Sequence, residues 1–501
     1  MSEDYERLLE LLAEVSDLQS AASVLGWDEL TYMPEGGASA RGEQMATLSR
    51  LAHERFTSDA VGQLLGKLEA AGVGHGDEPA DLVVHETRVQ YDRMKLVPGH
   101  WVSRHAEASS KAYQAWAQAR QAKDFSLFAP DLQVQVDLAK ERGSYVPTAA
   151  DSYQGLLYFH EPDFSVDELD RLFGDLASFL SPLLKEISAH SQRVDRSWTD
   201  VEWPEADQWR AFRLATEAIG FDYRHGRLDP TIHPFETSFD IDDVRLTTRV
   251  IPRDLFSGFF GSLHEAGHGL YERGMPVAFR RTPMAQAPSS GMHESQSRLW
   301  ENQVGRGRPF WQFFFPRLQA LFPEQLRGKS AEDVYRAANW SGPSFNRTEA
   351  DEVSYNLHVI LRFRLERRLF AGQLTVSELP AAWREETRAL LGVEPADDLI
   401  GVLQDVHWSH GGFAAFPSYT LGNVIAAQLM AAARRALPGL DQDFTRGEFS
   451  GLLGWLKREV HQQGARFTTK ALVERATGEP LGIGAYRAYI EEKYRELYAL
   501  R

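Results

Sequence analysis

The chain of 501 residues contains no cysteine. This absence excludes disulfide bonds, thiolate nucleophiles, iron–sulfur clusters and cysteine-ligated zinc. Any metal ion bound by the protein must therefore be held by histidine, aspartate or glutamate side chains. The absence is compatible with any cellular compartment, so it does not locate the protein.

Basic residues are also scarce, since 54 Lys and Arg face 71 Asp and Glu and the net charge is −17. Nucleic-acid-binding surfaces need clusters of basic side chains, so we expect no nucleic-acid partner. No apolar run reaches the roughly 18–20 residues that a membrane span requires, and the charged residues 1–7 do not resemble a secretory signal. We therefore expect no membrane association and a cytoplasmic location.

Long flexible linkers, low-complexity tracts and internal repeats are missing as well. The two stretches richest in small residues, 35–39 and 72–76, are short enough to be surface loops. A chain of this length can bury a large core without covalent cross-links. We expect a single domain over residues 1–501, with two lobes that flank a groove.

Apolar residues recur at helical spacing through most of the chain. The first such stripe starts at Tyr5, with Ser2 as a candidate cap and Gly26 as a candidate stop. Similar patterns predict helices over residues 80–97, 102–122, 164–190, 255–273, 290–303, 352–372, 420–436 and 484–500. The sequence therefore predicts a mostly α fold, a large helical bundle.

Residues 237–250 break the helical pattern. Phe239 and Ile241 alternate with polar neighbours, and so do Val244 and Leu246 after the turn signal at Asp242. A period of two on both sides of a turn is typical of a β-hairpin. We expect this small β element directly before the helix at 255–273.

That helix carries the most informative motif, His264-Glu265-Ala266-Gly267-His268. Residues i and i+4 share one helix face, so both imidazoles can reach one metal ion, and Glu265 can act as general base toward a water molecule. Gly267 and Gly269 each cost about 1 kcal/mol relative to alanine inside a helix. Their presence predicts that another element or a substrate approaches this helix closely.

Catalytic zinc usually has three protein ligands and one open position. Residues 289–296 have the pattern of a capped helix start and offer both His293 and Glu294. We take Glu294 as the third ligand, while His293 remains the alternative ligand or a substrate-orienting residue. Glu301, on the same helical face as Glu294, is a candidate to orient a ligand histidine. Two nitrogens and one carboxylate favour Zn²⁺, for which Co²⁺ or Mn²⁺ can substitute.

Several short motifs, spread over more than half of the chain, together resemble those of peptidase family M32, the carboxypeptidase Taq family of thermostable metallocarboxypeptidases. They are His233-Pro234-Phe235, Asp243-Val244-Arg245-Leu246-Thr247, His264–His268, His293-Glu294-Ser295-Gln296, Arg347-Thr348-Glu349-Ala350-Asp351 and Gly401–Trp408. Asn346 and His410 depart from the family pattern. Neither departure falls among the expected metal ligands.

The resemblance implies a helical fold similar to neurolysin and angiotensin-converting enzyme, with a deep active-site groove and a small sheet at its edge. It also implies a zinc-dependent carboxypeptidase that releases C-terminal residues with broad specificity from peptides with a free C-terminal carboxylate. Members of the family are typically homodimers, so we expect a homodimer here.

The family motifs also suggest roles for individual residues. Arginine binds a carboxylate through its planar fork, and Arg347 is the first choice for holding the substrate carboxylate. Arg245 and His233 are expected to line or close the end of the groove. Tyr419 and His407 are the candidates to stabilise the oxyanion, beside Glu265 as the catalytic base.

Two other functions remain open at this point. A zinc oligopeptidase or endopeptidase of similar fold would share the metal site but would need an open groove and no carboxylate clamp. A helical binding protein with a vestigial metal site is a third hypothesis, and the intact Glu265 argues against it.

Asp351 is a further candidate site residue, which could hold Arg347 in position.

Overall fold

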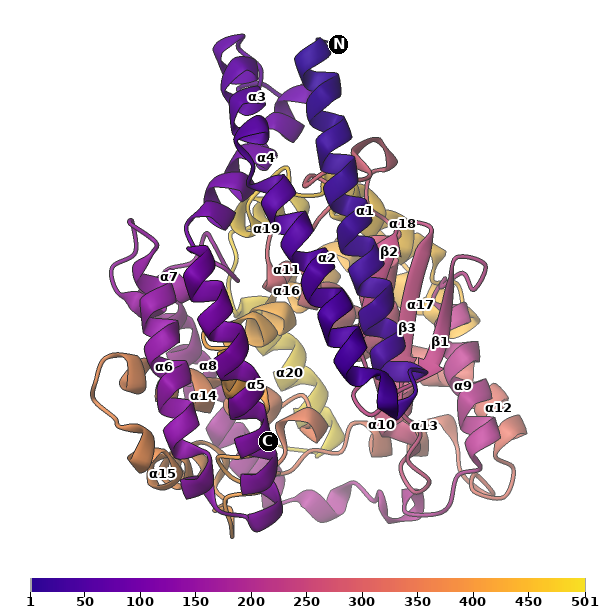
Figure 1. The fold of residues 1–501 in the computed structure, drawn as a ribbon. Helices are drawn as coiled ribbons and strands as arrows, with labels where there is room; N and C mark the ends of the chain where they lie inside the picture. Colours follow the sequence, from indigo (N-terminus) through magenta and orange to yellow (C-terminus); the bar gives the residue numbers. More distant parts are fainter. Residues whose placement is uncertain (1, 501) are drawn as a thin grey trace.

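The computed structural model describes residues 2–500, which form twenty α-helices and one three-stranded sheet (Figure 1). The predicted mostly α fold is confirmed, and each predicted helical range contains a helix. In the first half of the chain the helices are α1 (Glu3–Thr31), α2 (Ala38–Phe56), α3 (Asp59–Ala70), α4 (Pro79–Lys95), α5 (Gly99–Ala122), α6 (Ala129–Ser144), α7 (Ser152–Leu157), α8 (Val166–Ser188) and α9 (Glu205–Ala218).

The second half contains the helices that carry most of the motifs. They are α10 (Leu255–Glu272), α11 (Ser290–Arg298), α12 (Arg308–Leu321), α13 (Ala331–Ala338), α14 (Tyr355–Phe370), α15 (Leu379–Leu391), α16 (Phe416–Ala436), α17 (Leu440–Arg446), α18 (Ser450–Glu459), α19 (Thr469–Thr477) and α20 (Gly484–Leu497). Within residues 2–500, no helix combines the length and the apolar character that a bilayer crossing demands.

Helices α1–α4 share an apolar core of their own, which includes Leu8, Leu65 and Val84. Figure 1 shows this N-terminal unit at the top, with α1 and α2 extending downward in front of the sheet. Met284, from the connection between α10 and α11, is buried in the same core. Helix α1 continues beyond the predicted stop at Gly26, where the absence of a side chain allows the close approach of Met45 from α2.

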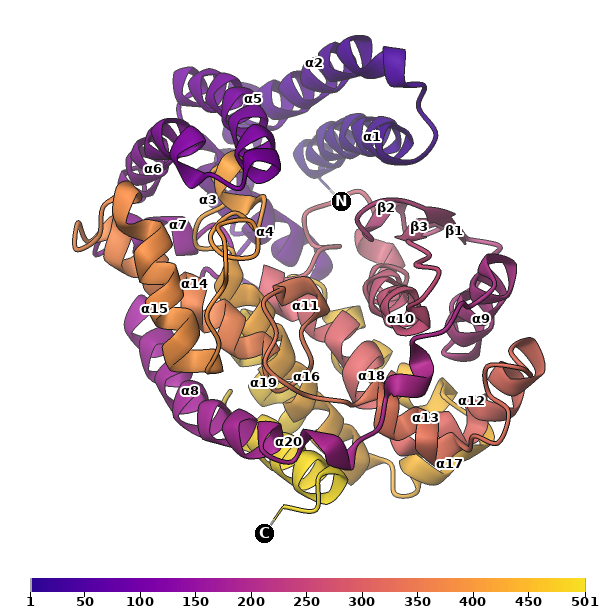
Figure 2. The same ribbon diagram turned by 90° about the horizontal axis from the view of Figure 1, so that it is seen from below.

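The larger core surrounds α10, α11, α14 and α16. Helix α16 is buried on nearly all sides, which explains its apolar sequence around Leu421, Ile425 and Leu429. Figure 2 shows α11 between α10 and α16, with the sheet on the far side of α10. The helices that carry the candidate ligands are therefore central to the main core.

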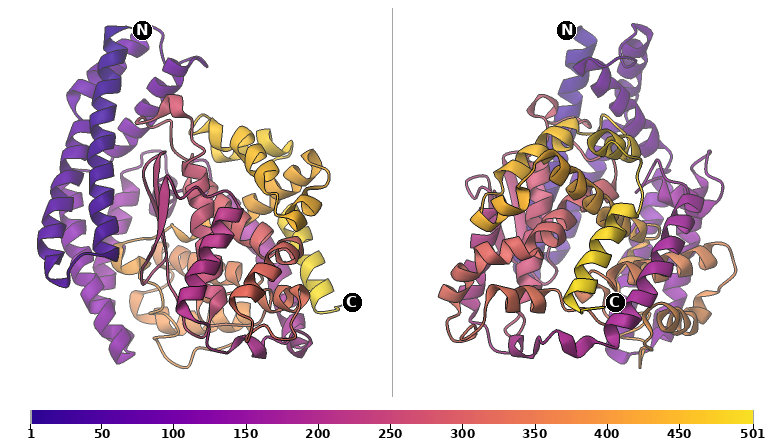
Figure 3. Two further views of the ribbon diagram at one scale, coloured as in Figure 1. Left: turned by 90° about the vertical axis from the view of Figure 1, so that its right-hand side faces the viewer. Right: turned by 180° about the vertical axis from the view of Figure 1, so that it is seen from behind.

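The sheet consists of β1 (Gly226–Pro230), β2 (Glu236–Asp240) and β3 (Asp243–Thr248) in the order β1-β3-β2. The predicted hairpin is confirmed as the antiparallel pair β2–β3, whereas the parallel pairing of β1 with β3 was not predicted. The sheet lies between the N-terminal helices and α10 (Figure 3).

Candidate active site

Two glycines bring the metal-site helices together. A Cβ on Gly267 of α10 would overlap the backbone of Gln296 and Ser297 in α11, and a Cβ on Gly422 of α16 would overlap the side chain of Glu294. The close approach predicted at Gly267 is therefore observed. Helix α11 is held between two glycine surfaces, which places Glu294 directly above the histidines of α10.

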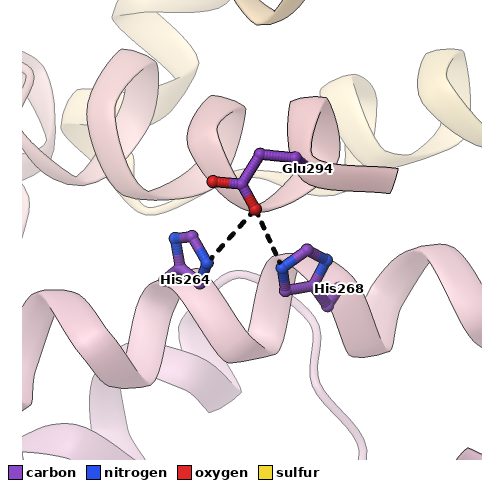
Figure 4. Close-up of side chains that lie close together, drawn as sticks. All are labelled: His264, His268 and Glu294. Carbon is purple, nitrogen blue, oxygen red and sulfur yellow. Dashed lines mark ion pairs between the residues drawn. The ribbon is translucent and has the colours of Figure 1, made fainter. Parts of the chain in front are cut away.

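His264, His268 and Glu294 converge on one point (Figure 4). Glu294 Oε2 lies 3.6 Å from His264 Nε2 and 3.4 Å from His268 Nε2. A tetrahedral ion with ligand bonds of about 2.0–2.1 Å separates its ligand atoms by about 3.3–3.4 Å. Both distances to Glu294 Oε2 therefore fit a single zinc-sized ion, and all three donor atoms lie within 4.8 Å of one another.

The protonation states of His268 and Glu294 suit a cation. Burial and the neighbouring His293 lower the pKa of His268 to about 3, so its lone pair is available at neutral pH. Burial opposes the ionisation of Glu294, but Arg298 and His264 outweigh it and hold the pKa well below its usual range. For His264 the carboxylates outweigh burial and raise the pKa, because Nδ1 has an anionic partner.

That partner is Glu301, whose Oε2 lies 2.9 Å from His264 Nδ1. When Nδ1 donates to a carboxylate, Nε2 carries the free lone pair and faces the metal position. Glu301 lies in the π-helical segment Leu299–Gly305 that follows α11, and such segments often occur at functional sites. The geometry thus fits the orienting role considered for Glu301.

Arg298 is a residue that we did not identify from the sequence. It donates to Glu294 Oε1 at 2.7 Å and to Glu301 Oε2 at 3.1 Å. Its spacing of four residues from Glu294 is the available sequence signal, because i,i+4 acid–base pairs meet on a helix face. Arg298 fixes both carboxylates and leaves Glu294 Oε2 for the metal.

His293, the alternative third ligand, is turned away from the metal position. Its ring stacks on His268 with centroids 4.5 Å apart, and its Nε2 lies 2.9 Å from Glu272 Oε1. Glu272 also lines a polar cavity of about 430 Å³ between α1 and β2, together with Glu236. His264, His268 and Glu294 do not line this cavity, which His293 reaches only through Glu272.

Glu265 is buried next to the first histidine, with an exposed fraction of 6%. Burial raises the pKa of Glu265 to about 7 against the opposing effect of His264. A carboxyl group that titrates near neutral pH can both accept and release a proton, as a general base must do.

A second charged cluster surrounds Arg347, which lies in the turn Arg347–Glu349. Its Nε and Nη2 donate to Asp405 Oδ1 at 3.1 and 2.9 Å, and its Nη1 donates to the Tyr355 hydroxyl at 3.1 Å. A guanidinium group has five N–H donors. Two therefore remain, one on each terminal nitrogen, as a bidentate carboxylate requires.

Asp405 is shared between Arg347 and the fully buried Arg362, whose Nε donates to Oδ2 at 2.6 Å. Burial opposes the ionisation of Asp405, but the two guanidinium groups hold its pKa well below its usual range. Two buried cations therefore share one anion, and the excess positive charge suits an anionic ligand. Asp351 does not contact Arg347 but accepts hydrogen bonds from Ser341 and Ser354 before α14.

Tyr419 lies between this arginine cluster and the metal site. Its ring centroid is 5.0 Å from the guanidinium carbon of Arg347, and its hydroxyl lies 3.1 Å from His407 Nε2. Burial raises the pKa of Tyr419, so the hydroxyl stays protonated, and burial lowers the pKa of His407 to about 4. Tyr419 is therefore a neutral hydrogen-bond donor next to a neutral imidazole.

Arg245 and His233 come from the sheet region, Arg245 from β3 and His233 from the connection between β1 and β2. Arg245 pairs with Asp243 at 2.6 Å, and its guanidinium carbon lies 4.9 Å from the ring centroid of Trp27 in α1. His233 is exposed in the loop between β1 and β2. Within residues 2–500 neither side chain makes a hydrogen bond or ion pair with Arg347, so their role at the groove end stays a prediction.

Comparison with known proteins places this site in a family context. Residues 7–494 match the model of the carboxypeptidase Taq (M32) metallopeptidase family. Over 99% of both chains, the sequence is 41% identical to thermostable carboxypeptidase 1 of Thermus thermophilus and 35% identical to carboxypeptidase 1 of Bacillus subtilis. The crystal structure of the M32 carboxypeptidase from Deinococcus radiodurans R1 is similar with a TM-score of 0.96 and 38% identity, covering 99% of this chain and 100% of that one.

Proposed function

This chain belongs to the carboxypeptidase Taq (M32) metallopeptidase family and is a metallocarboxypeptidase, and we propose that it is zinc-dependent and releases single residues from the free C-terminus of peptides with broad specificity. One observation carries this proposal. The buried cluster of Arg347, Arg362 and Asp405 has an excess positive charge and two unused N–H donors, close to a His₂Glu metal triad. A terminal carboxylate fits that cluster, whereas an internal peptide bond does not.

We propose His264, His268 and Glu294 as the metal ligands and Zn²⁺ as the native metal, with Co²⁺ or Mn²⁺ as substitutes. The donor set and the ligand spacing support this choice. When bound, the ion supplies a Lewis acid that polarises the scissile carbonyl and lowers the pKa of a water molecule. Glu301 and Arg298 keep the ligands in place.

The remaining steps belong to the side chains. Arg347 binds the terminal carboxylate and so positions the last peptide bond. Glu265 accepts a proton from the attacking water molecule while the water oxygen bonds to the carbonyl carbon. Glu265 then delivers that proton to the leaving nitrogen as the C–N bond breaks. The Tyr419 hydroxyl, oriented by His407, donates to the carbonyl oxygen as negative charge develops there.

A matched pair of peptides tests the proposal. The same sequence is supplied with a free C-terminus and with a C-terminal amide, and the products are followed over time by mass spectrometry. We expect stepwise loss of C-terminal residues from the free acid and little cleavage of the amide. Equal cleavage of both peptides at internal bonds would instead indicate an endopeptidase.

We also propose that the protein is cytoplasmic and forms a homodimer. The dimer is supported by the family resemblance, and the cytoplasmic location is an expectation from the sequence. Light scattering coupled to size-exclusion chromatography measures the molar mass in solution. A mass near that of one 56.5 kDa chain at micromolar concentration would contradict the dimer.

A further inference from the structure

Tyr355 is the first residue of α14, and the turn before it fixes its position. Its backbone N–H donates to the carbonyl oxygen of Asp351 at 2.9 Å. The carboxylate of Asp351 accepts from the Ser354 hydroxyl at 2.6 Å and from the Ser341 hydroxyl at 2.6 Å. Asp351 therefore acts on the site indirectly, by presenting Tyr355.

The Tyr355 side chain contacts both charged clusters. The guanidinium carbon of Arg298, which holds Glu294, lies 4.2 Å from the Tyr355 ring centroid. The Tyr355 hydroxyl accepts from Nη1 of Arg347 at 3.1 Å. A single side chain with an exposed fraction of 5% thus connects the metal triad to the carboxylate cluster.

The Tyr355 hydroxyl also has an unused donor. A phenol can donate one hydrogen bond while it accepts another, and no residue among 2–500 accepts from this hydroxyl. A buried donor without an acceptor is costly. A carboxylate bound to the two free N–H groups of Arg347 would lie next to this hydroxyl and satisfy it.

We propose that Tyr355 has two separable roles: its hydroxyl binds the terminal carboxylate of the peptide together with Arg347, and its ring positions Arg298, and through it the metal ligand Glu294. The proposal rests on the carboxypeptidase function proposed above. The two roles use different atoms of the same side chain, so two substitutions can separate them.

Tyr355→Phe removes the hydroxyl and keeps the ring. We expect KM for a peptide with a free C-terminus to rise about tenfold, because a hydrogen bond to a charged group is lost. We expect kcat to stay within about threefold, and the zinc affinity of the apoprotein, measured by titration against a chromophoric chelator, to stay within about twofold, because the ring remains under Arg298.

Tyr355→Leu removes the ring as well. We expect the same rise in KM and, in addition, a roughly tenfold loss of zinc affinity, because Arg298 loses its aromatic support. Arg298→Lys tests the second role independently, since lysine keeps the charge but cannot form the planar fork that holds two carboxylates. We expect a loss of zinc affinity of about tenfold in that variant, with KM changed less than in Tyr355→Phe.

Tyr223 provides a matched control. Its ring centroid lies 4.2 Å from the guanidinium carbon of Arg213 and its hydroxyl bonds to Thr216, so its cation partner is neither Arg298 nor Arg347. Tyr223→Phe and Tyr223→Leu should leave KM and zinc affinity unchanged.

An unchanged KM in Tyr355→Phe would overturn the first role, and equal zinc affinity in wild type and Arg298→Lys would overturn the second. If the wild-type protein binds zinc but removes no C-terminal residue, the proposed function fails instead.

Discussion

The metal triad and the arginine cluster are both buried, yet they present groups of opposite sign to a ligand. Around the metal position, the carboxylates of Glu294 and Glu301 share Arg298, and Glu301 also pairs with Arg306. The second oxygen of Glu294, Oε2, faces neutral His268. Around Arg347, two guanidinium groups share the single carboxylate of Asp405. A ligand of opposite sign stabilises a buried charged group, so the two clusters suit different ligands. One suits a metal cation and the other a peptide carboxylate.

The two clusters also differ in how they are supported. The proposed metal ligands lie on α10 and α11, two helices of the main core that approach closely at Gly267. Arg347 and Asp405 lie instead in short turns and loops, whose geometry depends on side-chain hydrogen bonds. Residues on helices are held more precisely than residues on loops, so the two sites should respond differently to substitution.

The largest expected effect comes from Glu265→Gln, which removes the base and keeps the shape. We expect kcat to fall by a factor of about 10²–10⁴, while the protein keeps one equivalent of zinc, because Glu265 is not a ligand. Steady-state kinetics and metal analysis of the same sample measure both. Glu217→Gln, an exposed glutamate on α9, serves as the control, and loss of zinc in Glu265→Gln would show that the role assignment is wrong.

Substitution of the third ligand is expected to act on the metal first. Glu294→Ala should weaken zinc binding by more than about a hundredfold, since ligands matter more than their supporting residues. His293→Ala should retain zinc within about tenfold because His293 bonds to Glu272 and faces away. Chelator competition on both apoproteins makes the comparison, and the reverse order of affinities would identify His293 as the ligand.

Arg347→Lys tests the opposite cluster. Lysine keeps the charge but loses the fork, so we expect kcat/KM for free-acid peptides to fall about ten- to a hundredfold with zinc affinity unchanged. Kinetics on the free acid and its amide give the measurement. Arg308→Lys, in an exposed ion-pair network, is the control. A variant that still discriminates fully between acid and amide would place the carboxylate elsewhere.

The smallest effect concerns support of the loop that carries Asp405 and His407. Glu366 accepts hydrogen bonds from Trp408 Nε1 at 2.8 Å, from the Tyr153 hydroxyl at 2.8 Å and from the Ala414 N–H at 3.0 Å. Glu366→Gln replaces one acceptor oxygen with a donor, and we expect a loss of about 1–3 kcal/mol in the free energy of unfolding. Urea denaturation measures it. If Glu366→Gln lowered the zinc affinity as much as Glu294→Ala does, the two clusters would not be independently supported.

The sequence was informative where function depends on local spacing. His264 and His268 could be paired because helix geometry alone puts them on one face, and the β2–β3 hairpin could be predicted because its alternation is local. Asp405, Arg362 and Tyr355 could not be assigned roles, since their contacts to Arg347 depend on how separate elements pack. Strand β1 was missed for the same reason, because a parallel partner leaves no signal in so short a segment.

Met284 gives the metal site a mechanical connection to the N-terminal unit. It is buried in the core of α1–α4, yet it belongs to the segment that joins α10 to α11, the two helices that carry the proposed metal ligands. A tilt of the N-terminal unit would therefore displace the connection between α10 and α11. In the reverse direction, a bound ion that clamps those helices together would slow the amide hydrogen exchange of α1–α4, far from any ligand atom.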